Sequence, residues 1–424
     1  MITARAFAGR HYAVYGLARS GLATAEALIA SGARVTAWDA KDEARAKAPA
    51  GAAIVDLDAA DLTLFDSLVV TPGLPLNRHP IAQRARDTGV EIIGDIELFA
   101  RARPELPPHK VVGITGTNGK STTTALVQHI LQTAGVPSTM GGNIGLPILA
   151  QDPLPEGGVY VLELSSYQID LTQSLDCDLA VLLNITPDHL DRYESFEAYR
   201  DSKLRLFEMS SGQHIGSPAK AGAQTGEAVA AIGGKDALHA TGPLPSQENW
   251  RTLQGPHNAQ NAAAARLVCE ELGVDENAVE QGLRTYPGLP HRMERIREKD
   301  GVAFVNDSKA TNPASTAPAL AAFDRIRWIC GGQAKTDNLD ECAPHFGHVR
   351  KAYTIGEAGE LFASLLSPHM PVSKCGTLER AVGEAAAESE SGDTVLLSPA
   401  CASFDQFRDF EQRGDQFREL VGAL

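Results

Sequence analysis

The segment GITGTNGKSTTT, residues 113–124, carries the strongest indication of a fold class in this sequence. It follows the apolar residues Val111 and Val112, and it precedes a segment that carries Leu126, Ile130 and Leu131 on one helical face. A strand, a glycine-rich turn and a helix in this order are typical of a phosphate-binding turn, because successive backbone N–H groups and the helix N-terminus face the anion. The stretch therefore predicts a nucleotide site in an α/β domain.

The turn is a variant of the GxxxxGK[ST] phosphate loop. Ile114 stands where the first glycine of that pattern belongs, and Gly116 supplies the turn instead. In this interpretation Lys120 would hold the β- and γ-phosphates of ATP, and the hydroxyl of Ser121 would ligate Mg²⁺. The alternative is a glycine-rich connection between a strand and a helix with an incidental lysine.

Apolar runs alternate with amphipathic stretches throughout the 424 residues, which is the pattern of parallel sheets covered by helices. Because the chain is too long for one ordinary core, and because prolines and glycines interrupt the pattern at 101–110 and 285–296, we predict three α/β domains. Their predicted limits are 1–97, 98–288 and 289–424. The stretch 210–250 is interpreted as an irregular surface excursion.

Composition excludes several classes of protein. The hydrophobic and charged fractions are 43% and 21%, and no apolar run approaches the roughly 20 residues of a membrane helix. A formal net charge of −15 disfavours nucleic acid or an anionic membrane as the main partner. The six cysteines lack CxxC spacing, which argues against a disulfide framework or a structural zinc site. Since the N-terminus carries no secretory signal, we expect a cytoplasmic protein.

A second glycine-rich turn, GLARSG at 16–21, also follows a predicted strand and opens a helix, and Asp39 ends the next strand. Ala18 replaces the middle glycine of the dinucleotide fingerprint, the one that lets the backbone approach a pyrophosphate. The turn is therefore a weak indication of an NAD cofactor. A nucleotide group of a substrate remains the alternative.

Polar residues also end two apolar runs of the central segment. Glu163 interrupts the run VYVLEL, and Asn184, Asp188, His189 and Asp191 follow the run LAVLL. A carboxylate within a buried strand is costly unless it binds something, so Glu163 is a candidate Mg²⁺ ligand. Its alternative is a partly exposed edge residue. His189 is either a second ligand or a hydrogen-bonding or capping residue.

The segment 194–209 is predicted to be an amphipathic helix. Residue chemistry alone indicates that Lys203 on this helix is a solvated surface lysine.

Several segments, in this order, resemble the Mur ligase family of peptidoglycan precursor synthesis. They are GITGTNGKSTTT, VLELSSYQ (161–168), NITPDHLDRY (184–193), GPHNAQNAAAA (255–265) and PGLPHRMERI (287–296). Two further segments, NDSKATNP (306–313) and LLSPACASFDQFRDFEQRG (396–414), are similar to those of the family members that add D-glutamate to UDP-N-acetylmuramoyl-L-alanine. The resemblance spans essentially the whole chain.

The resemblance implies a Rossmann-like N-terminal domain for the UDP-linked substrate, a central phosphate-loop ATPase-type domain with a mostly parallel sheet, and a Rossmann-like C-terminal domain for the amino acid. It also implies ATP and two Mg²⁺ ions as cofactors, one of the ions bound through a carbamylated Lys203. We expect a monomer that acts on small molecules.

The resemblance further implies a role for each matching residue. The UDP-linked substrate would contact Arg19, Ser20, Asp39, Gly73, Asn143, Ser165 and His189. Metal would be held by Ser121, Glu163, His189 and Lys203, and ATP by Gly116, Thr117, Asn118, Gly119, Lys120, Ser121, Thr122, Asn258, Asn261, Arg292 and Asp307. D-glutamate would lie among Lys309, Thr311, Lys335, Ser403, Phe404 and Phe410. The implied catalytic residues are Lys120, His189, Lys203 and His291, the last as a stabiliser of the tetrahedral intermediate.

Two departures from the family pattern concern the amino-acid pocket. Phe404 replaces a leucine that is common at this position, and GGQAKTDN (331–338) lacks the acidic residue and the second glycine that often follow the paired glycines. For Lys335 taken alone, a loop lysine is the alternative. Among competing functions, a folylpolyglutamate synthase, an NAD-dependent oxidoreductase and a nucleotide-binding switch would each explain only part of the motifs.

Overall fold

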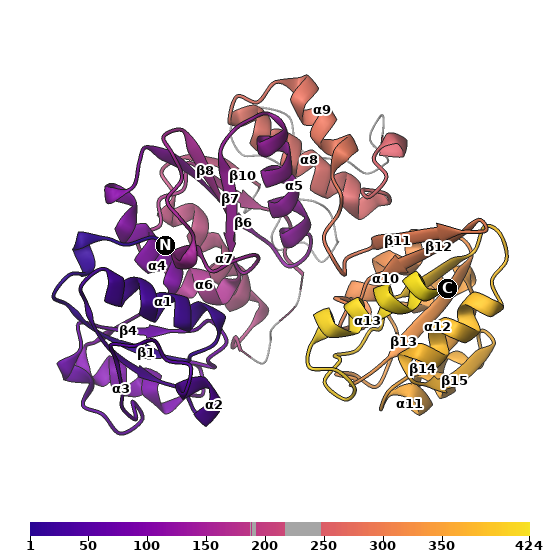
Figure 1. The fold of residues 1–424 in the computed structure, drawn as a ribbon, viewed down its shortest axis with the longest axis horizontal. Helices are drawn as coiled ribbons and strands as arrows, with labels where there is room; N and C mark the ends of the chain where they lie inside the picture. Colours follow the sequence, from indigo (N-terminus) through magenta and orange to yellow (C-terminus); the bar gives the residue numbers. More distant parts are fainter. Residues whose placement is uncertain (187, 189–191, 217–246) are drawn as a thin grey trace. The chain divides into compact units, whose positions relative to one another are not determined.

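Three sheets covered by helices organise the part of the chain that the structure describes (Figure 1). The computed structural model describes residues 1–186, 188, 192–216 and 247–424. The described residues of Met1–Thr241 and Gln260–Leu283 form one compact unit, and those of Gly242–Ala259 and Arg284–Leu424 form a second. The predicted α/β fold class is confirmed. The predicted limits of the three domains stay a prediction, as does the surface excursion, most of which lies outside the described residues.

The first sheet is parallel, with strand order β3-β2-β1-β4-β5. The order reverses at β1, and ligands of open α/β sheets bind beyond the carboxyl ends of the strands at such a point. The apolar runs at 12–16, 34–39, 67–71 and 91–93 predict four of these strands to within one residue at each end, but they do not predict β3, a short, partly exposed edge strand. The elements are β1 (His11–Tyr15), α1 (Arg19–Ala30), β2 (Arg34–Trp38), α2 (Asp42–Arg45), β3 (Ala52–Ile54), β4 (Ser67–Val70), α3 (Pro80–Thr88), β5 (Glu91–Ile93) and α4 (Asp95–Ala102).

The second sheet is also parallel, with order β10-β9-β6-β8-β7. All side chains of β8 and β9 are buried, as expected of strands covered on both faces. The elements are β6 (His109–Thr115), α5 (Lys120–Thr133), β7 (Ser138–Gly142), β8 (Gly158–Glu163), α6 (Ser166–Asp170), β9 (Leu179–Leu182), α7 (Phe196–Met209), β10 (Gln213–Ile215), α8 (Pro256–Glu271) and α9 (Glu276–Thr285).

One hydrophobic core joins these two sheets. Phe99 of α4 is fully buried, and its ring centroid lies 5.0 Å from that of Tyr160 on β8. The backbone N–H of Ile2 donates to the carbonyl of Leu149 (3.0 Å). This shared core explains why the first and second sheets belong to one compact unit.

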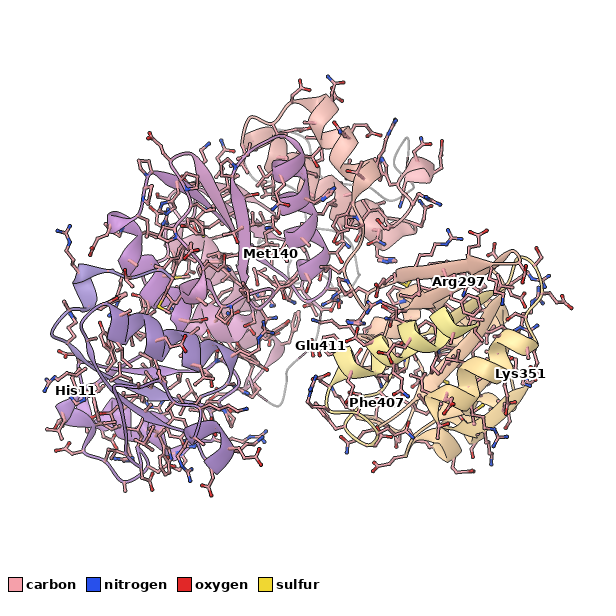
Figure 2. All side chains as sticks on the ribbon, viewed as in Figure 1. His11, Met140, Arg297, Lys351, Phe407 and Glu411 are labelled. Atoms are coloured by element: carbon pink, nitrogen blue, oxygen red, sulfur yellow. The ribbon has the colours of Figure 1, made fainter. Side chains whose placement is uncertain are left out.

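The third sheet is mixed, with order β11-β12-β16-β13-β14-β15, and its edge strand β11 is antiparallel to β12. Figure 2 marks Arg297 on β11 and Lys351 on β14. The apolar runs at 302–305, 326–330, 353–355 and 394–397 predict four of these strands, but they do not predict β11, whose residues ERIREK are mostly charged, or β15. The elements are β11 (Glu294–Lys299), β12 (Val302–Asn306), α10 (Pro313–Ala321), β13 (Ile326–Gly331), β14 (Val349–Ile355), α11 (Gly359–Leu366), β15 (Val372–Gly376), α12 (Leu378–Ala387), β16 (Thr394–Leu397) and α13 (Phe410–Ala423).

Two expectations from composition can be compared with the structure. All six cysteines are buried and free. Within the described residues, the structure contains no helix that is both long and apolar enough to cross a membrane.

Candidate functional site

The phosphate loop connects β6 to α5 in the way the sequence predicted. Gly116 and Gly119 have φ angles of 151° and 82°, a region that glycine adopts without a side-chain clash. The Nζ of Lys120 donates to the carbonyls of Gly116 and Thr117, both at 2.8 Å. The Lys120 side chain therefore folds back over the loop that is predicted to bind phosphate. Ser121 and Thr122 follow in the first turn of α5.

Asn261 of α8 lies directly against this loop. A Cβ added to Gly119 would be 2.3 Å from the Oδ1 of Asn261, so no larger residue fits there without movement. The hydroxyl of Thr123 donates to the same Oδ1 (3.4 Å). The structure thus brings one predicted ATP residue from far along the chain to the phosphate loop.

Asn184, which follows β9, holds the loop from the other side. Its Oδ1 accepts from the backbone N–H of Asn118 (2.8 Å), and its Nδ2 donates to the carbonyl of Asn118 (3.0 Å). Its own carbonyl accepts from the N–H of Thr117 (2.9 Å). The sequence pattern predicted that Asn184 follows a strand, but it indicated no specific role for this residue. The signal for such a role was that a polar residue follows a second apolar run of the same domain.

Glu163 ends β8 beside the last residues of β6 and β7. Its side chain is 2% exposed, which contradicts the alternative of an exposed edge residue. Its Oε1 accepts from the Nδ2 of Asn143 (2.8 Å), while its Oε2 is buried without a hydrogen-bond partner among the described residues. A buried carboxylate oxygen left in this state is costly, and it suits a cation ligand.

Lys203 of α7 is also buried, with 2% exposure, so the prediction of a solvated surface lysine is wrong. Residue chemistry could not anticipate this because the burial results from the packing of α7. The Nζ of Lys203 donates to the carbonyl of Gly116 (2.9 Å), in the phosphate loop, and lies 4.7 Å from the ring centroid of Tyr199. The carbonyl of Gly116 thus accepts hydrogen bonds from the Nζ atoms of both Lys120 and Lys203.

Burial, and after it the nearby charge of Lys120, hold the pKa of Lys203 well below its ordinary value of 10.5. Asp188, Asp170 and Glu163 act in the opposite direction. The environment therefore favours a neutral amine at Lys203.

Two of the predicted metal ligands offer oxygen donors, which Mg²⁺ prefers. Glu163 offers a free carboxylate oxygen, and Ser121, which begins α5 next to Lys120, offers a buried hydroxyl. The other predicted ligand, His189, lies outside the described residues. Among those that are described, no three His, Cys, Asp or Glu side chains converge in a group that could hold a metal.

Those predicted UDP-substrate residues that the structure describes lie at the carboxyl ends of the strands of the first and second sheets. Asp39 closes the glycine-rich turn, since its Oδ2 accepts from the N–H of Leu17 (2.7 Å). The guanidinium of Arg19 donates to the carbonyl of Gly145 (3.0 Å), which follows β7. Ser165 caps α6 through a hydrogen bond from the N–H of Gln168 (3.2 Å). Ser20 is the second residue of α1, and Gly73 lies in the turn after β4.

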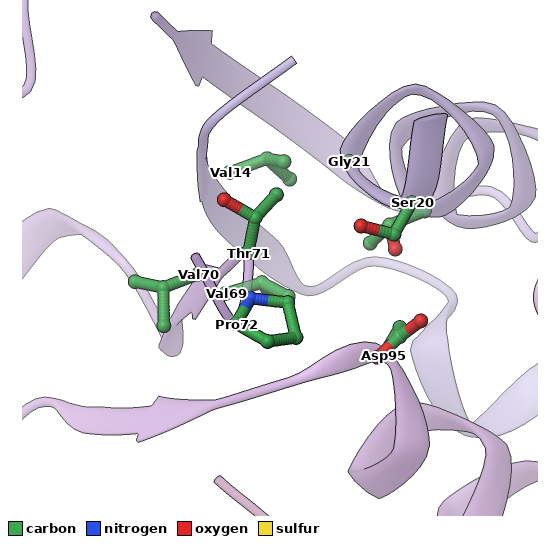
Figure 3. Close-up of a pocket in the computed structure, with 9 residues that line it drawn as sticks. Val14, Ser20, Gly21, Val69, Val70, Thr71, Pro72 and Asp95 are labelled. Atoms are coloured by element: carbon green, nitrogen blue, oxygen red, sulfur yellow. The ribbon is translucent and has the colours of Figure 1, made fainter. Parts of the chain in front are cut away.

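A small cavity of about 10 Å³ lies beneath these turns (Figure 3). It has room for about one water. Its lining includes Ser20, Thr71 and Asp95, and Asp95 is only 4% exposed. The Oδ1 of Asp95 accepts from the N–H of Ile96 (3.0 Å). Burial nevertheless raises the pKa of the Asp95 carboxyl from 3.8 to about 6.

The remaining predicted ATP residues belong to the second compact unit. The Nδ2 of Asn258 donates to the carbonyl of Gln254 (3.0 Å). Asp307 is buried; its Oδ2 accepts from the hydroxyl of Ser398 (2.7 Å) and its Oδ1 from the N–H of Met293 (3.2 Å). Burial raises the pKa of Asp307 to about 7 despite these bonds. Arg292 immediately precedes Met293.

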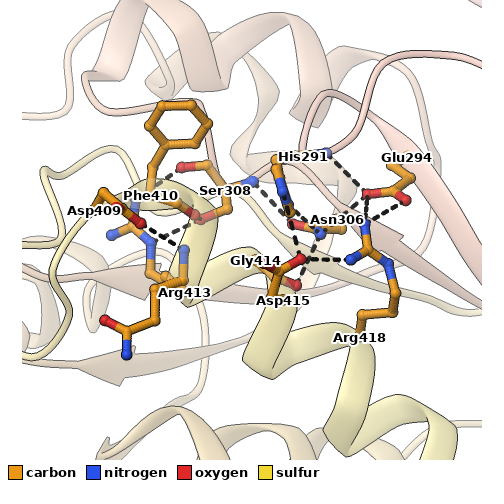
Figure 4. A network of polar contacts seen from close by, with 11 residues as sticks. His291, Glu294, Asn306, Ser308, Asp409, Phe410, Arg413, Gly414, Asp415 and Arg418 are labelled. Atoms are coloured by element: carbon orange, nitrogen blue, oxygen red, sulfur yellow. Dashed lines mark hydrogen bonds and ion pairs between the residues drawn. The ribbon is translucent and has the colours of Figure 1, made fainter. Parts of the chain in front are cut away.

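His291 lies in a tightly constrained turn of this unit (Figure 4). Its φ is 61°, and its backbone N–H donates to Glu294 (2.8 Å). Its Nδ1 is 3.0 Å from the Nδ2 of Asn306, and a Cβ added to Gly414 would lie 2.1 Å from that Nδ1. Burial lowers the pKa of His291 from 6.5, which favours the neutral ring. The stabilising role of His291 stays a prediction.

The predicted D-glutamate residues come from three segments, 309–311, 335 and 403–410, and Arg413 of α13 joins the first to the last. The Arg413 guanidinium is fully buried and donates to the carbonyls of Ser308 (2.8 Å) and Cys401 (3.1 Å). Next to Ser308, the Nζ of Lys309 lies 4.7 Å from the ring centroid of Phe410. Figure 4 shows Phe410, Ser308 and Arg413 together. The sequence did not identify Arg413, although it lies within the motif used for the resemblance.

The other predicted residues of this pocket lie on loops. Ser403 is buried, whereas the side chain of Phe404 is 68% exposed. The exposed Lys335 follows Gln333, which pairs with Ala402 through two backbone hydrogen bonds of 2.9 and 3.0 Å. This pairing brings the Lys335 loop next to Ser403. Thr311 lies between β12 and α10.

Comparisons with known proteins match this architecture. The chain matches the families described as "Mur ligase middle domain", over residues 114–216, and "Mur ligase, glutamate ligase domain", over residues 291–401. A UDP-N-acetylmuramoylalanine--D-glutamate ligase of Novosphingobium aromaticivorans is 59% identical over 429 residues, which cover 100% of this chain and 97% of the relative. A relative of the same name from Rhizobium meliloti is 45% identical over 456 residues, covering 100% and 98%.

Solved structures agree in fold. A UDP-N-acetylmuramate-alanine ligase of Thermotoga maritima has a TM-score of 0.58 at 17% identity, and the match covers 98% of this chain and 99% of that one. A MurF ligase of the same organism has a TM-score of 0.56 at 17% identity, covering 88% and 98%. These structures are similar in fold, and the curated relatives are similar in sequence over their full lengths. The chain therefore belongs to the Mur ligase family.

Proposed function

We propose that this chain is an ATP-dependent ligase that adds D-glutamate to UDP-N-acetylmuramoyl-L-alanine and releases ADP and phosphate, a step of peptidoglycan precursor synthesis. One observation carries the proposal: a phosphate loop lies beside the buried carboxylate of Glu163 and the buried amine of Lys203, in a chain that is 59% identical along its whole length to a relative named as such a ligase.

The proposal also assigns one substrate to each of the three predicted domains. Residues 1–97 would bind the UDP-linked substrate, 98–288 ATP and 289–424 D-glutamate. The enzyme would act in the cytoplasm as a monomer on these small molecules. The acidic net charge of −15 supports a role away from nucleic acid.

Activation of the carboxylate is the chemical problem that ATP would solve. A carboxylate oxygen of the alanyl group would attack the γ-phosphorus of ATP, the bond to ADP would break, and an acyl phosphate would form. The amine of D-glutamate would then attack the acyl carbon; the amide bond forms, phosphate leaves, and the amine releases its protons. One oxygen of the starting carboxylate therefore ends in the released phosphate.

The residues of the phosphate loop suit the first of these steps. Two anions must approach each other, so the ammonium of Lys120 and the N–H groups at the start of α5 would hold the phosphates and offset their charge. Glu163, the Ser121 hydroxyl and His189 would hold Mg²⁺, which supplies further positive charge to the phosphates when it is bound.

Lys203 would provide a ligand for a second Mg²⁺ as a carbamate. Its neutral amine would form a C–N bond with carbon dioxide and release a proton, so that a carboxylate-like anion takes the place of a basic side chain. The lowered pKa of Lys203 supports this step because an ammonium has no lone pair with which to attack.

Replacement of Lys203 tests the carbamate. The variant Lys203→Ala should lose activity, and bicarbonate or a short carboxylic acid should restore part of it. The matched control is Lys110→Ala, because Lys110 is an exposed lysine on β6. Full activity of Lys203→Ala without added acid would refute the carbamate.

An oxygen-labelling experiment tests the acyl phosphate. The substrate would carry ¹⁸O in both oxygens of its alanyl carboxylate, and released phosphate would be analysed by mass spectrometry. We expect one ¹⁸O atom in each phosphate formed. Phosphate without the label would show that the carboxylate is not phosphorylated.

A further inference from the structure

Arg192 links the turn after β4 to the central sheet, and none of the roles described above involves it. Its Nη2 donates to the carbonyls of Leu74 (2.8 Å) and Pro72 (3.5 Å), and its Nη1 donates to the carbonyl of Gly73 (3.4 Å). Three successive carbonyls of one turn therefore face a single guanidinium. Gly73 in this turn is one of the residues predicted to bind the UDP-linked substrate.

The other side of the guanidinium lies on an aromatic ring. The Cζ of Arg192 is 4.2 Å from the ring centroid of Tyr167, which in turn stacks on Tyr193 at 6.0 Å with an interplanar angle of 15°. The ring of Tyr193 is 5.4 Å from that of Tyr199, and the hydroxyl of Tyr199 is 3.1 Å from the Oγ1 of Thr117. The contacts thus run without interruption from the turn to the phosphate loop.

Hydrogen bonds fix the middle of this path to α7. The hydroxyl of Tyr193 donates to the Oδ2 of Asp170 (2.7 Å), and the hydroxyl of Ser202 donates to the Oδ1 of the same carboxylate (2.7 Å). Ser202 immediately precedes Lys203, whose amine donates to the phosphate loop. Both ends of the path therefore lie at groups that the proposed reaction uses.

This geometry specifically suits arginine. A guanidinium is planar, offers five N–H donors in a fixed fork and stacks on aromatic rings, whereas a lysine ammonium is a compact charge that can serve fewer of these contacts at once. At position 192, lysine would keep the charge but would lose the stack on Tyr167 and most of the fork.

We propose that Arg192 is a positioning residue that holds the turn Pro72, Gly73 and Leu74 in register with the phosphate loop, so that a UDP-linked substrate presents its carboxylate there. The inference rests on the proposed function, because it requires that the turn binds this substrate. It extends that function by naming the side chain that couples the two sites.

The test uses the full chain and four variants. Arg192→Met removes the charge and the fork, Arg192→Lys keeps the charge, and Tyr167→Leu removes the ring beneath the guanidinium. Arg200→Met is the matched control, since Arg200 is a partly exposed arginine of α7 that pairs with its neighbour Asp201 (2.8 Å). For each variant, UDP-N-acetylmuramoyl-L-alanine binding is measured by calorimetry, and KM is measured separately for this substrate and for ATP.

We expect Arg192→Met to weaken binding of the UDP-linked substrate and raise its KM at least about tenfold, with the KM for ATP within about twofold of wild type. Arg192→Lys should recover part of the loss, Tyr167→Leu should weaken binding severalfold, and Arg200→Met should behave as wild type. If Arg192→Met does not fold, the Lys and Tyr167 variants give the same comparison.

Three results would overturn the inference and can be told apart. If the wild type binds the UDP-linked substrate and all variants bind it equally well, Arg192 has no positioning role. If the wild type does not bind this substrate, the proposed function fails and the inference fails with it. An equal loss for both substrates, or a lower unfolding temperature with unchanged KM values, would show that Arg192 is only a structural link.

Discussion

Gly119 offers a sharp test of the phosphate loop, because the structure predicts two separate costs for a single added methyl group. In Gly119→Ala the residue must keep a φ of 82°, which L-residues rarely adopt, at the position that caps α5. The new Cβ would also lie 2.3 Å from the Oδ1 of Asn261, well inside van der Waals contact. Either the loop or Asn261 must therefore move.

The two costs can be given rough magnitudes. A left-handed conformation costs an alanine about 1 kcal/mol or somewhat more, and overpacking costs typically about 1–3 kcal/mol. The total is roughly 2–4 kcal/mol. If this falls on the conformation that binds ATP, the Kd for ATP rises at least about 30-fold, since about 1.4 kcal/mol corresponds to a factor of ten.

The assay is calorimetric titration of the variant with ATP in the presence of Mg²⁺, together with urea unfolding. The matched control is Gly135→Ala: Gly135 follows α5, has a φ of 75°, and no described atom lies within 4 Å of a Cβ added to it. The control should lose about 1 kcal/mol of stability and bind ATP normally. Wild-type ATP affinity in Gly119→Ala would refute the account of the loop, as would equal losses of affinity in the two variants.

Three further changes test other parts of the site. In Glu163→Gln the amide oxygen can still accept a hydrogen bond from Asn143, so the fold should persist. The Mg²⁺ concentration that gives half-maximal activity should be at least about tenfold higher than in wild type. An unchanged Mg²⁺ requirement would contradict the assignment of Glu163 as a ligand. Asn184→Ala removes two side-chain hydrogen bonds to Asn118, each worth about 1 kcal/mol. Steady-state kinetics should therefore show a KM for ATP about 30-fold higher. A KM within twofold of wild type would refute the role of Asn184 in holding the phosphate loop. Because the folded-state pKa of Asp95 is raised from 3.8 to about 6, its stabilising contribution is complete below about pH 4 and is lost as the pH rises through 6. The stability of Asp95→Asn relative to wild type, from urea unfolding, should therefore increase by roughly 2–3 kcal/mol between pH 4 and 8, and a constant difference would contradict the burial argument.

The carboxyl ends of strands were the most predictable part of the molecule. The turn before Lys120 and the position of Glu163 follow from an apolar run that gives way to glycine or to a carboxylate, and the structure places both at the same edge of the second sheet. Such patterns are local, so the chain need not be folded to reveal them. The edge strands β3 and β11 escaped prediction because exposed, polar strands carry little hydrophobic signal.

The rest of the site depends on packing between distant segments. Nothing in the helical pattern of 194–209 indicates that Lys203 faces the phosphate loop, and its burial follows from the way α7 packs on β9. Asn261 reaches Gly119 only because α8 returns to the first compact unit. The contacts of Arg192 join residues about 120 positions apart in the chain. Only the resemblance to the Mur ligase family indicated Lys203 and Asn261, and it left Arg192 without a role.

Phosphate release with different amino acids measures the proposed ligase activity and its amino-acid specificity together. The purified chain would be incubated with ATP, Mg²⁺ and UDP-N-acetylmuramoyl-L-alanine, and phosphate would be measured after addition of D-glutamate, L-glutamate, L-alanine or a diamino acid. We predict that only D-glutamate supports sustained phosphate release, with one amide product formed for each phosphate. Turnover with another of these amino acids but not with D-glutamate, or phosphate release that needs no amino acid, would contradict the proposed function.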